Sequence, residues 1–565
     1  MKTFKDYQYV RPNMDTFQER FNEEIKLFSN ASTLEEAERA FNTINDLRKE
    51  FDTMSNLASI RHSINTKDDY YDAEETFFNE NRPIFEQLEN RFYQALTKSS
   101  YEVDLRDSKG NLLFDKAYQT LKTFNDAILE DLKQENKLTF EYQKLLASAE
   151  IEFQGEIRNL SQMAPFVQSK DRTIRKAASD EIANFFESNE DTLDTIYDKL
   201  VHVRTNIAKT LGYDNFVQLA YDRLGRLDYT ASDVANYRKQ VKDHLVPLVK
   251  TLIDRQAKRL NIASMKSYDL PLSYLSGNPT PKGDRKWMVE KARKMYHAMS
   301  PETKAFFDFM ETHELMDLDA KKGKSGGGYC TYIFDYKSPF IFANFNGTSH
   351  DVDVLTHEAG HAFQVFMSRE YDVLEYIWPT LEACEIHSMS MEFFAWPWIK
   401  EFFVEDTEKY RFSHIESALK FIPYGVAVDA FQHVIYENPN LTPAERKATW
   451  RKIEQEYMPY KDYDGNAFFE RGGFWFRQSH IFEVPFYYID YTLAQVCAFQ
   501  YWKRSQEDYQ TAWESYVKLC KAGGSKTFLQ LLDHAGLNNP FESGTIESIL
   551  PSLKAFLDAI DDTKF

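Results

Sequence analysis

Cysteine is scarce in this sequence, which has only four in 565 residues. They lie far apart and include no C-x-x-C pair: Cys330, Cys384, Cys497 and Cys520. This spacing argues against a disulfide framework and against a cysteine metal site. We predict reduced thiols, most of them buried, in a cytoplasmic protein.

Positive charge is also in short supply, with 68 Lys and Arg against 88 Asp and Glu and a net charge of −20. Such a surface repels nucleic acid and anionic lipid, so neither is an expected partner. No apolar run is long enough to span a membrane, and Met1 to Val10 lacks the apolar segment of a signal peptide. The oligomeric state cannot be inferred from these features.

Helical patterns dominate the first 160 residues. Thr33 and Glu36 form a capping box, in which a hydroxyl and a carboxylate each accept a hydrogen bond from an amide at the helix start. An apolar stripe at steps of three and four residues follows: Ala37, Phe41, Ile44, Leu47, Phe51, Met54 and Ala58. Residues 107–111 predict a turn. Helical patterns resume from about residue 170 to 315.

The pattern changes at residues 321–328, KKGKSGGG, which predict a mobile loop. Two short strands follow, at residues 329–335 and 340–345, with turn residues between them. This arrangement predicts a hairpin. An exposed edge of the first strand can pair with an extended peptide, and the glycines can let the loop close over it. Gly327, Gly328 and Tyr329 are therefore candidate substrate-binding residues; an ordinary surface hairpin is the alternative.

The sequence His357-Glu358-Ala359-Gly360-His361 carries the strongest chemical signal. Two histidines four apart share one face of a helix and can hold one zinc ion. Glu358 can then take a proton from zinc-activated water as the general base. We expect this helix to begin near residues 348–351 and to end near Ser368. The alternative is a helix with two solvated or core histidines.

A catalytic zinc needs a third protein ligand, and no histidine follows at the short spacing of some zinc peptidases. A second helix, expected over residues 380–403, offers Glu382, Glu385 and Glu392 on roughly one face. Spacing alone leaves both Glu382 and Glu385 open as ligands. The neighbours His387 and Cys384 point away from that face, and we interpret both as structural.

At this point the sequence resembles the oligoendopeptidase F and thimet oligopeptidase group of zinc metallopeptidases. The resemblance rests on four segments in order: residues 341–347, 351–363, the helix of Glu385, and 480–491, with a further likeness at 211–216. It implies that Glu385 is the third ligand. A ligand histidine usually donates its other N–H to a carboxylate, and we expect Glu392 to accept it.

The segment from His480 to Tyr491 holds a second group of candidates. Tyr488 and Tyr491 are three apart and share a helical face, with Pro485 expected in the first turn. Periodicity alone favours an aromatic core stripe over a set of donors. The resemblance implies that His480, Tyr488 and Tyr491 donate hydrogen bonds to substrate and transition state. The gap after His480 is shorter than in thimet-type relatives, which leaves Tyr487 as a rival to Tyr488 and as a further candidate substrate-binding residue.

These observations predict a mainly α protein with a small sheet beside the zinc helix. The resemblance implies two largely helical halves around a deep active-site channel, and we expect residues 1–200 to form one wall and 201–565 the catalytic region. The predicted function is a zinc-dependent endopeptidase that cleaves internal bonds of short oligopeptides, with one Zn²⁺ per chain, although cobalt or manganese can exchange.

Two other functions compete with this prediction. A non-catalytic peptide-binding protein with a structural zinc is the first, and Glu358 argues against it because a structural site needs no base. An aminopeptidase is the second, but the sequence lacks the G-x-M-E-N motif that would anchor a substrate amine.

Overall fold

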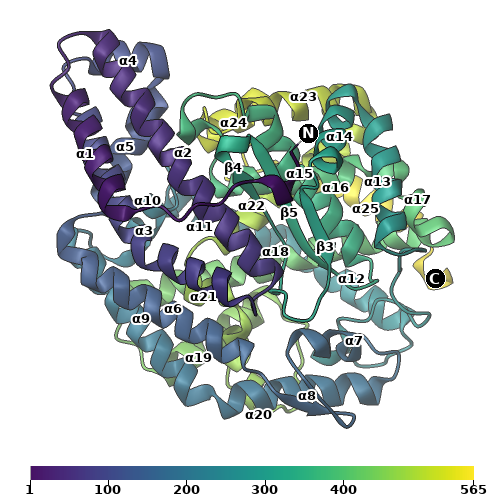
Figure 1. Ribbon diagram of the computed structural model, residues 1–565. Helices are drawn as coiled ribbons and strands as arrows, with labels where there is room; N and C mark the ends of the chain where they lie inside the picture. The colour runs from purple at the N-terminus through teal and green to yellow at the C-terminus, as the bar shows by residue number, and fades with distance from the viewer. Residues whose placement is uncertain (1) are drawn as a thin grey trace.

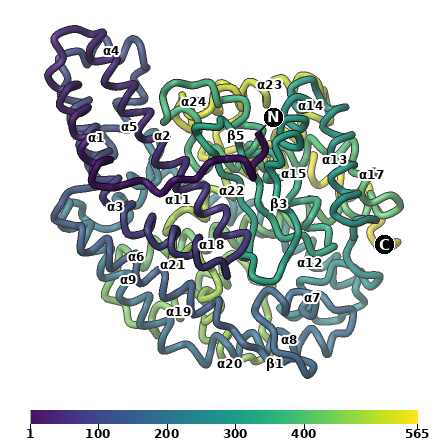
Figure 2. Tube along the Cα trace, in the orientation of Figure 1, coloured from purple at the N-terminus to yellow at the C-terminus, as the bar shows by residue number. Residues whose placement is uncertain are grey.

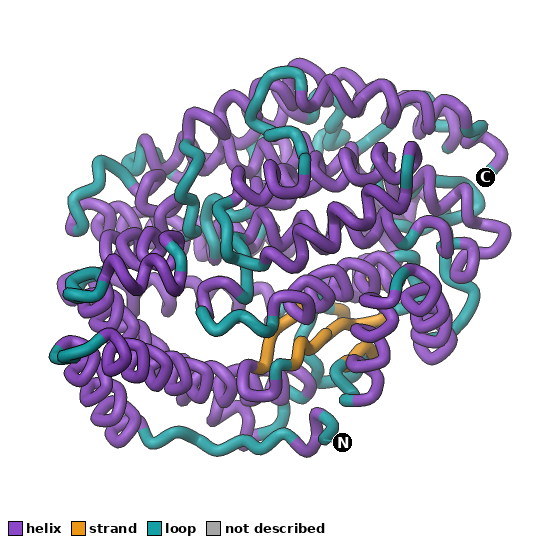
Figure 3. Tube along the Cα trace, turned by 90° about the horizontal axis from the view of Figure 1, so that it is seen from above, coloured by secondary structure: helices purple, strands orange, loops and turns teal. Residues whose placement is uncertain are grey.

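The computed structural model describes residues 2–565, so Met1, at the start of the predicted N-terminal region, lies outside it. The chain is mainly α, as predicted, and its strands form one two-stranded ribbon and one three-stranded sheet. Figures 1 and 3 show these strands as small elements within a largely helical body. No helix within residues 2–565 is long and apolar enough to cross a membrane. The four cysteines are unpaired, and all except Cys330 are buried.

The first five helices form an arm with its own apolar core, which projects from the body in Figure 1. Val373 and Tyr376, from a distant loop, complete that core. The segment before the arm runs from the N-terminus, beside the sheet, to α1 (Figure 2). The Tyr7 hydroxyl in this segment hydrogen-bonds Ser338 Oγ of the sheet at 2.7 Å. The helices of the arm are α1 (Met14–Ser29), α2 (Leu34–Ile64), α3 (Asp69–Leu96), α4 (Glu102–Lys109) and α5 (Asn111–Thr123).

Helix α2 begins as the capping pattern predicts. Thr33 Oγ1 accepts from the amide of Glu36 at 3.2 Å, while the Glu36 carboxylate accepts from the amide of Ser32 at 2.8 Å, one residue earlier than expected. The predicted apolar stripe is buried except for Met54, which is half-buried. Capping and burial therefore act together to define this helix.

A second, larger core runs from Phe4 to Leu557 and includes side chains of helices on both sides of residue 200. The division into regions 1–200 and 201–565 stays a prediction. The elements between the arm and the sheet are α6 (Leu129–Ala147), β1 (Ile151–Phe153), β2 (Glu156–Arg158), α7 (Ala164–Val167), α8 (Arg172–Ser188), α9 (Glu190–Thr210), α10 (Phe216–Arg223), α11 (Ala231–Gln240), α12 (Val246–Arg259), α13 (Arg285–Met299) and α14 (Pro301–Thr312).

The three-stranded sheet has the order β3-β5-β4, with β3 (Met316–Asp319), β4 (Tyr329–Ile333) and β5 (Ser338–Phe345). Strands β4 and β5 form the predicted antiparallel hairpin, and β4 is an edge strand. The first strand is shorter than expected because a 3₁₀ turn, Phe334–Tyr336, replaces its end. Strand β3 was not predicted, and it pairs parallel to β5.

The glycine-rich segment at residues 321–328 is a loop, as predicted, but it is anchored to the sheet. The Lys324 side chain is fully buried and donates to the Asp317 carboxylate at 2.6 Å and to the carbonyl of Ala343 at 2.5 Å. Asn344 Nδ2 donates to the carbonyls of Ser325 and Gly327, both at 2.8 Å. These bonds hold the loop against β3 and β5.

The second half of the chain departs from the sequence expectation in two helices. The helix expected over 380–403 ends at Phe394, and Pro485 lies between two helices instead of in a first turn. The helices are α15 (His350–Ser368), α16 (Leu381–Phe394), α17 (Lys400–Phe403), α18 (Thr407–Glu437), α19 (Pro443–Tyr457), α20 (Ala467–Glu470), α21 (Ser479–Glu483), α22 (Tyr488–Glu507), α23 (Tyr509–Ala522), α24 (Phe528–Ala535) and α25 (Thr545–Ala559).

Candidate metal centre

Helix α15 starts directly after β5, and the turn between them is fixed by Asp351. Its carboxylate accepts from the amides of Asn346 and Gly347 at 2.9 and 2.7 Å. A carboxylate in the first helical turn also interacts favourably with the helix dipole. The sheet therefore sets the direction in which α15 presents its histidines.

Helices α15 and α16 touch at Gly360. A Cβ atom built there would lie 2.6 Å from the carbonyl oxygen of His387, closer than any real Cβ contact. Only glycine allows this approach without a shift of one helix. The close contact brings α16 within side-chain reach of the two histidines of α15.

His357, His361 and Glu385 form a cluster whose ligand atoms all lie within 4.8 Å of one another. Glu385 Oε2 is 3.3 Å from His357 Nε2 and 3.5 Å from His361 Nε2. Ligand atoms of a tetrahedral zinc site with bonds of about 2.1 Å lie about 3.4 Å apart. Two imidazole nitrogens and one carboxylate oxygen at this spacing fit a zinc ion with an open fourth position.

Glu385 is held in place by two hydroxyl groups. Tyr487 Oη donates to Oε1 at 2.8 Å, and Ser388 Oγ donates to Oε2 at 2.9 Å. Burial alone would raise the pKa of Glu385, but His361 and His357 keep that pKa well below its usual range. The carboxylate is therefore ionised, as a metal ligand must be.

A chain of hydrogen bonds leads from Nδ1 of His357 to the indole of Trp396. His357 Nδ1 is 2.7 Å from Glu392 Oε1, as expected, and Glu392 Oε2 is 2.7 Å from His414 Nε2. Trp396 Nε1 donates to His414 Nδ1 at 3.0 Å. Because the indole N–H can only donate, His414 must accept at Nδ1 and donate to Glu392 from Nε2. Glu392 then accepts from both imidazoles, which leaves His357 Nε2 for a metal.

Glu358 is 7% exposed, and its Oε2 has no hydrogen-bond partner among the described residues. Burial raises the pKa of its carboxyl group. A Cβ atom at Gly328 would lie 3.6 Å from Glu358 Oε1 and 3.4 Å from the carbonyl oxygen of Phe342. Gly328 thus lies directly against the candidate base, at the start of edge strand β4.

Gly327 and Tyr329, the candidate substrate-binding residues on either side of Gly328, differ in their surroundings. Gly327 has a φ of +82°, and no atom lies within 4 Å of a Cβ built there, so it borders open space. Tyr329 stacks on Phe342 with ring centroids 4.8 Å apart. The structure therefore places Gly327 and Gly328 at an accessible edge and gives Tyr329 a packing contact within the sheet.

The candidates from the His480 segment gather in one aromatic group. His480 Nε2 is 3.4 Å from Tyr491 Oη, and its ring centroid is 4.8 Å from that of Tyr488. The ring centroids of Tyr487 and Tyr491 are 4.9 Å apart. Because Tyr487 also bonds Glu385, this group adjoins the metal cluster. Burial lowers the pKa of His480 to about 4.

Three residues near His357, His361 and Glu385 lie outside the cluster. Glu382 is fully buried, and burial raises its pKa although the charge of Arg226 opposes that shift. His387 is also fully buried, with no hydrogen-bond partner for either ring nitrogen among residues 2–565, and burial lowers its pKa to about 3. Cys384 is buried on the same helix. The structure thus brings Glu385, and not Glu382, to the histidines.

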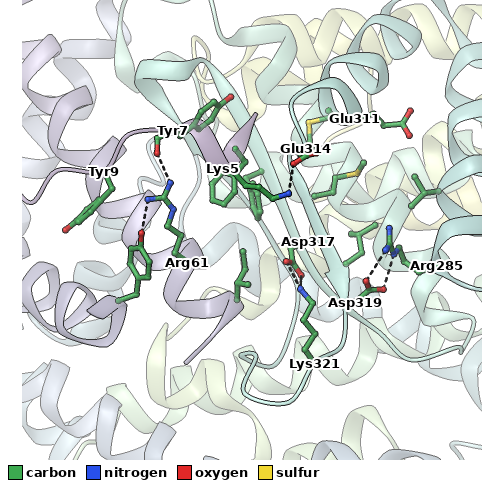
Figure 4. Close-up of a pocket in the computed structure, with 18 of the residues that line it drawn as sticks. Lys5, Tyr7, Tyr9, Arg61, Arg285, Glu311, Glu314, Asp317, Asp319 and Lys321 are labelled. Atoms are coloured by element: carbon green, nitrogen blue, oxygen red, sulfur yellow. Dashed lines mark hydrogen bonds and ion pairs between the residues drawn. The ribbon is translucent and has the colours of Figure 1, made fainter. Parts of the chain in front are cut away.

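A cavity of about 1020 Å³ lies between the N-terminal segment, α2 and β3 (Figure 4). No member of the His357 cluster lines it. Six of its charged side chains pair within the lining: Lys5 with Glu314 at 3.1 Å, Arg285 with Asp319 at 3.0 Å and Lys321 with Asp317 at 2.9 Å. Because the cavity lacks the clustered histidines and most of its charges are paired, it is not the candidate site.

Comparisons with known proteins agree with this geometry. Residues 166–278 and 302–550 match peptidase family M3, and residues 4–124 match the peptidase M3 N-terminal domain. The chain is 25% identical over 432 residues to the oligoendopeptidase F homologue of Borreliella burgdorferi, covering 74% of this chain and 70% of that protein.

Two solved structures are similar over almost the whole chain. PZ peptidase A, solved with an inhibitor, is 55% identical over 99% of this chain and 100% of its own, with a TM-score of 0.96. A protein of Bacillus anthracis strain Ames, provisionally named oligoendopeptidase F, is 51% identical over 100% of both chains, with a TM-score of 0.92.

Proposed function

The chain belongs to peptidase family M3, and we propose that it is a zinc-dependent endopeptidase that cleaves internal bonds of short oligopeptides. Membership in this family makes it a metallopeptidase that acts on oligopeptides. One observation carries the finer proposal: Glu358, buried with a free oxygen, directly follows the first histidine of the His357, His361 and Glu385 cluster.

His357, His361 and Glu385 would hold one zinc ion per chain. When bound, zinc supplies a Lewis acid that lowers the pKa of water to about 7 and polarises the scissile carbonyl. Glu392 hydrogen-bonds His357 at Nδ1, and Tyr487 donates a hydrogen bond to Oε1 of Glu385. Nitrogen and oxygen ligands of this kind also accept cobalt or manganese.

Glu358 would act as the general base. Its unpartnered Oε2 can accept a proton from the attacking water and later pass that proton to the leaving amine. A raised pKa suits both steps because the carboxyl group must gain and lose a proton in one cycle. The short distance between Gly328 and Glu358 supports a base beside the edge strand that would carry the peptide.

His480 and Tyr491 would donate hydrogen bonds to the oxygen that becomes negative as water attacks, with Tyr488 as a further donor. The lowered pKa of His480 keeps it neutral at pH 7, so its value as a donor depends on which ring nitrogen carries the proton. The closeness of His480 and Tyr491, at 3.4 Å, supports a shared task.

The substrate would bind as an additional strand on β4, because main-chain hydrogen bonds at a sheet edge tolerate many side chains. Gly327 and Gly328 would leave space for the peptide backbone. The region 1–200 would form the wall opposite the metal, which restricts access to short, flexible peptides.

One experiment tests the proposal. The protein is incubated with a mixed peptide library, with and without a chelator. In a second incubation the substrate is a stably folded protein whose sequence includes peptides cleaved in the first. Mass spectrometry should show internal cleavage of short peptides, no cleavage after chelation and an intact folded protein. Peptide binding without cleavage would favour a binding protein with a structural zinc, and rapid digestion of the folded protein would contradict an enclosed site.

A further inference from the structure

A chain of hydrogen bonds reaches His480 from the side away from Tyr491. Tyr424 Oη, on α18, donates to Gln478 Oε1 at 2.7 Å. Gln478 Nε2 lies 2.8 Å from His480 Nδ1. On the other side of the ring, His480 Nε2 faces Tyr491 Oη at 3.4 Å. Neither Tyr424 nor Gln478 belongs to a motif that the sequence singles out.

The direction of this chain follows from the hydroxyl of Tyr424. Among the described residues, its bond to Gln478 is the one hydrogen bond that Tyr424 Oη makes. In this bond the hydroxyl donates its proton to the amide oxygen, so the amide NH₂ faces His480. An amide nitrogen can donate but not accept. His480 Nδ1 must therefore present its lone pair to Gln478.

A neutral imidazole carries one proton, and if Nδ1 accepts, that proton is on Nε2. Burial lowers the pKa of His480 to about 4, although the charge of Glu385 opposes the shift, so the ring is neutral at pH 7. The aromatic rings of Tyr487, Tyr488 and Tyr491 surround its other side. The Nε2–H bond thus points toward the group that would meet the substrate.

We propose that Gln478 and Tyr424 are positioning residues that hold His480 in the tautomer with its proton on Nε2. This inference rests on the proposed function, because a donor at Nε2 has a task only if an oxyanion forms beside it. With the proton on Nδ1, Nε2 would present a lone pair to the developing negative charge and would repel it.

The arrangement resembles the orientation of a metal-bound histidine by a carboxylate, but it uses a neutral amide. A carboxylate can only accept, so it would draw the proton onto Nδ1. An amide with its oxygen already occupied by Tyr424 can only donate. Glu392 therefore favours a proton on Nδ1 of His357, whereas Gln478 favours a proton on Nε2 of His480.

The first test reads the tautomer directly. Protein labelled with ¹⁵N-histidine is studied by long-range ¹H–¹⁵N NMR at pH 7, and the His480→Ala variant identifies the signals of His480. We expect a protonated Nε2 and an unprotonated Nδ1. A proton on Nδ1 would overturn the inference and would leave the proposed peptidase function untouched.

The second test removes the positioning residue. Gln478→Met keeps the side-chain length but cannot donate, so His480 should populate both tautomers in the NMR spectrum. We expect kcat to fall roughly 10-fold or more, toward the roughly 10²-fold loss typical of removing an oxyanion donor, with KM changed less than about twofold and zinc content unchanged. Tyr424→Phe should act in the same direction, and it carries the test if the first variant does not fold.

Gln500→Met is the matched control. Gln500 is a buried glutamine of α22 that exchanges two hydrogen bonds with the backbone of Asn538, at 3.0 and 2.8 Å, away from the metal cluster. It should lower stability without changing kcat or the His480 signals. Equal losses of kcat in Gln478→Met and Gln500→Met, with an unchanged His480 tautomer, would reduce Gln478 to a structural role. Normal kcat in His480→Ala would instead count against the proposed function, whatever the tautomer.

Discussion

Tyr487 donates a hydrogen bond from its hydroxyl to Oε1 of Glu385 at 2.8 Å. The bond joins the start of α22 to the carboxylate whose other oxygen lies 3.3 Å from His357 Nε2. By sequence, Tyr487 competes with Tyr488 as an oxyanion donor. The contact supports a different task, in which Tyr487 orients Glu385 so that Oε2 faces the two histidines.

Tyr487→Phe should therefore weaken zinc binding, because Glu385 would lose the donor that fixes its orientation. We expect the zinc dissociation constant to rise about 10- to 100-fold, as for other partners of metal ligands. Competition with a chromophoric chelator measures it. Tyr488→Phe, which alters the neighbouring ring without a contact to Glu385, is the control. Unchanged zinc affinity in Tyr487→Phe together with a large loss of kcat would make Tyr487 an oxyanion donor instead.

His361→Ala should abolish stoichiometric zinc binding and hydrolysis, because only two of the three clustered ligand atoms would remain. Elemental analysis after dialysis checks the metal content. In the unaltered protein, a chelator should stop hydrolysis and added zinc should restore it. His202→Ala, which changes an exposed histidine of α9, should keep both zinc and activity. Full zinc content in His361→Ala would contradict the site.

Glu358→Gln replaces one carboxylate oxygen by NH₂ and keeps the side-chain shape. Because Glu358 is not one of the three clustered ligands, zinc content and peptide affinity should remain. Turnover should fall by at least about 10²-fold, the lower range for a general base. Steady-state kinetics at peptide concentrations well above KM measure this loss. Turnover near that of the unaltered protein would move the base elsewhere.

Local spacing was enough to predict several parts of the site. His357 and His361 are one helical turn apart, so their shared face follows from helix geometry alone. The hairpin β4–β5 follows from two apolar runs with turn residues between them. Glu392 was predicted as the partner of His357 from the general chemistry of ligand histidines, and the structure confirms the contact at 2.7 Å.

Other parts depend on contacts between distant segments, which spacing cannot reveal. Glu382 and Glu385 are equivalent on a helical wheel, and only the docking of α16 on α15 at Gly360 separates them. Gln478 hydrogen-bonds Tyr424 of α18, and His414 hydrogen-bonds Glu392 of α16, so neither pairing can be read from local spacing. Strand β3 escaped prediction because its alternating residues Asp317 and Asp319 are acidic, and their charges are satisfied by lysine and arginine side chains after folding.

Stability should fall with pH below neutrality, partly through His433. This histidine of α18 is 5% exposed, and burial lowers its pKa to about 4 although the charge of Asp429 opposes the shift. An unfolded histidine has a pKa near 6.5, so the unfolded chain binds more protons between these values. The free energy of unfolding that His433 contributes by staying neutral is fully present above about pH 6.5. It is lost as pH falls toward 4, by at most about 1.4 kcal/mol per pH unit.

His433→Gln should reduce this pH dependence. The shift of the urea unfolding midpoint between pH 7 and pH 5 should be smaller in the variant, even though loss of the contact to Tyr221 Oη at 3.2 Å lowers stability at both values. The exposed His202→Gln variant serves as the control and should behave like the unaltered protein. Equal shifts in all three proteins would show that His433 does not contribute.

Tyr491→Phe distinguishes an oxyanion donor from a core aromatic residue. The substitution removes one hydroxyl, 3.4 Å from His480 Nε2, and keeps the ring that packs on Tyr487 and Tyr488. If the hydroxyl stabilises the developing oxyanion, its contribution is larger in the transition state than in the bound substrate. The variant should then lose roughly 10²-fold or more in kcat with a small change in KM and normal zinc content.

If Tyr491 only packs, kcat should be unchanged and the free energy of unfolding should fall by about 1 kcal/mol, the contribution of one hydrogen bond. Steady-state kinetics and a melting curve on this variant separate the two cases, because a packing role cannot lower kcat while zinc content and melting temperature stay normal.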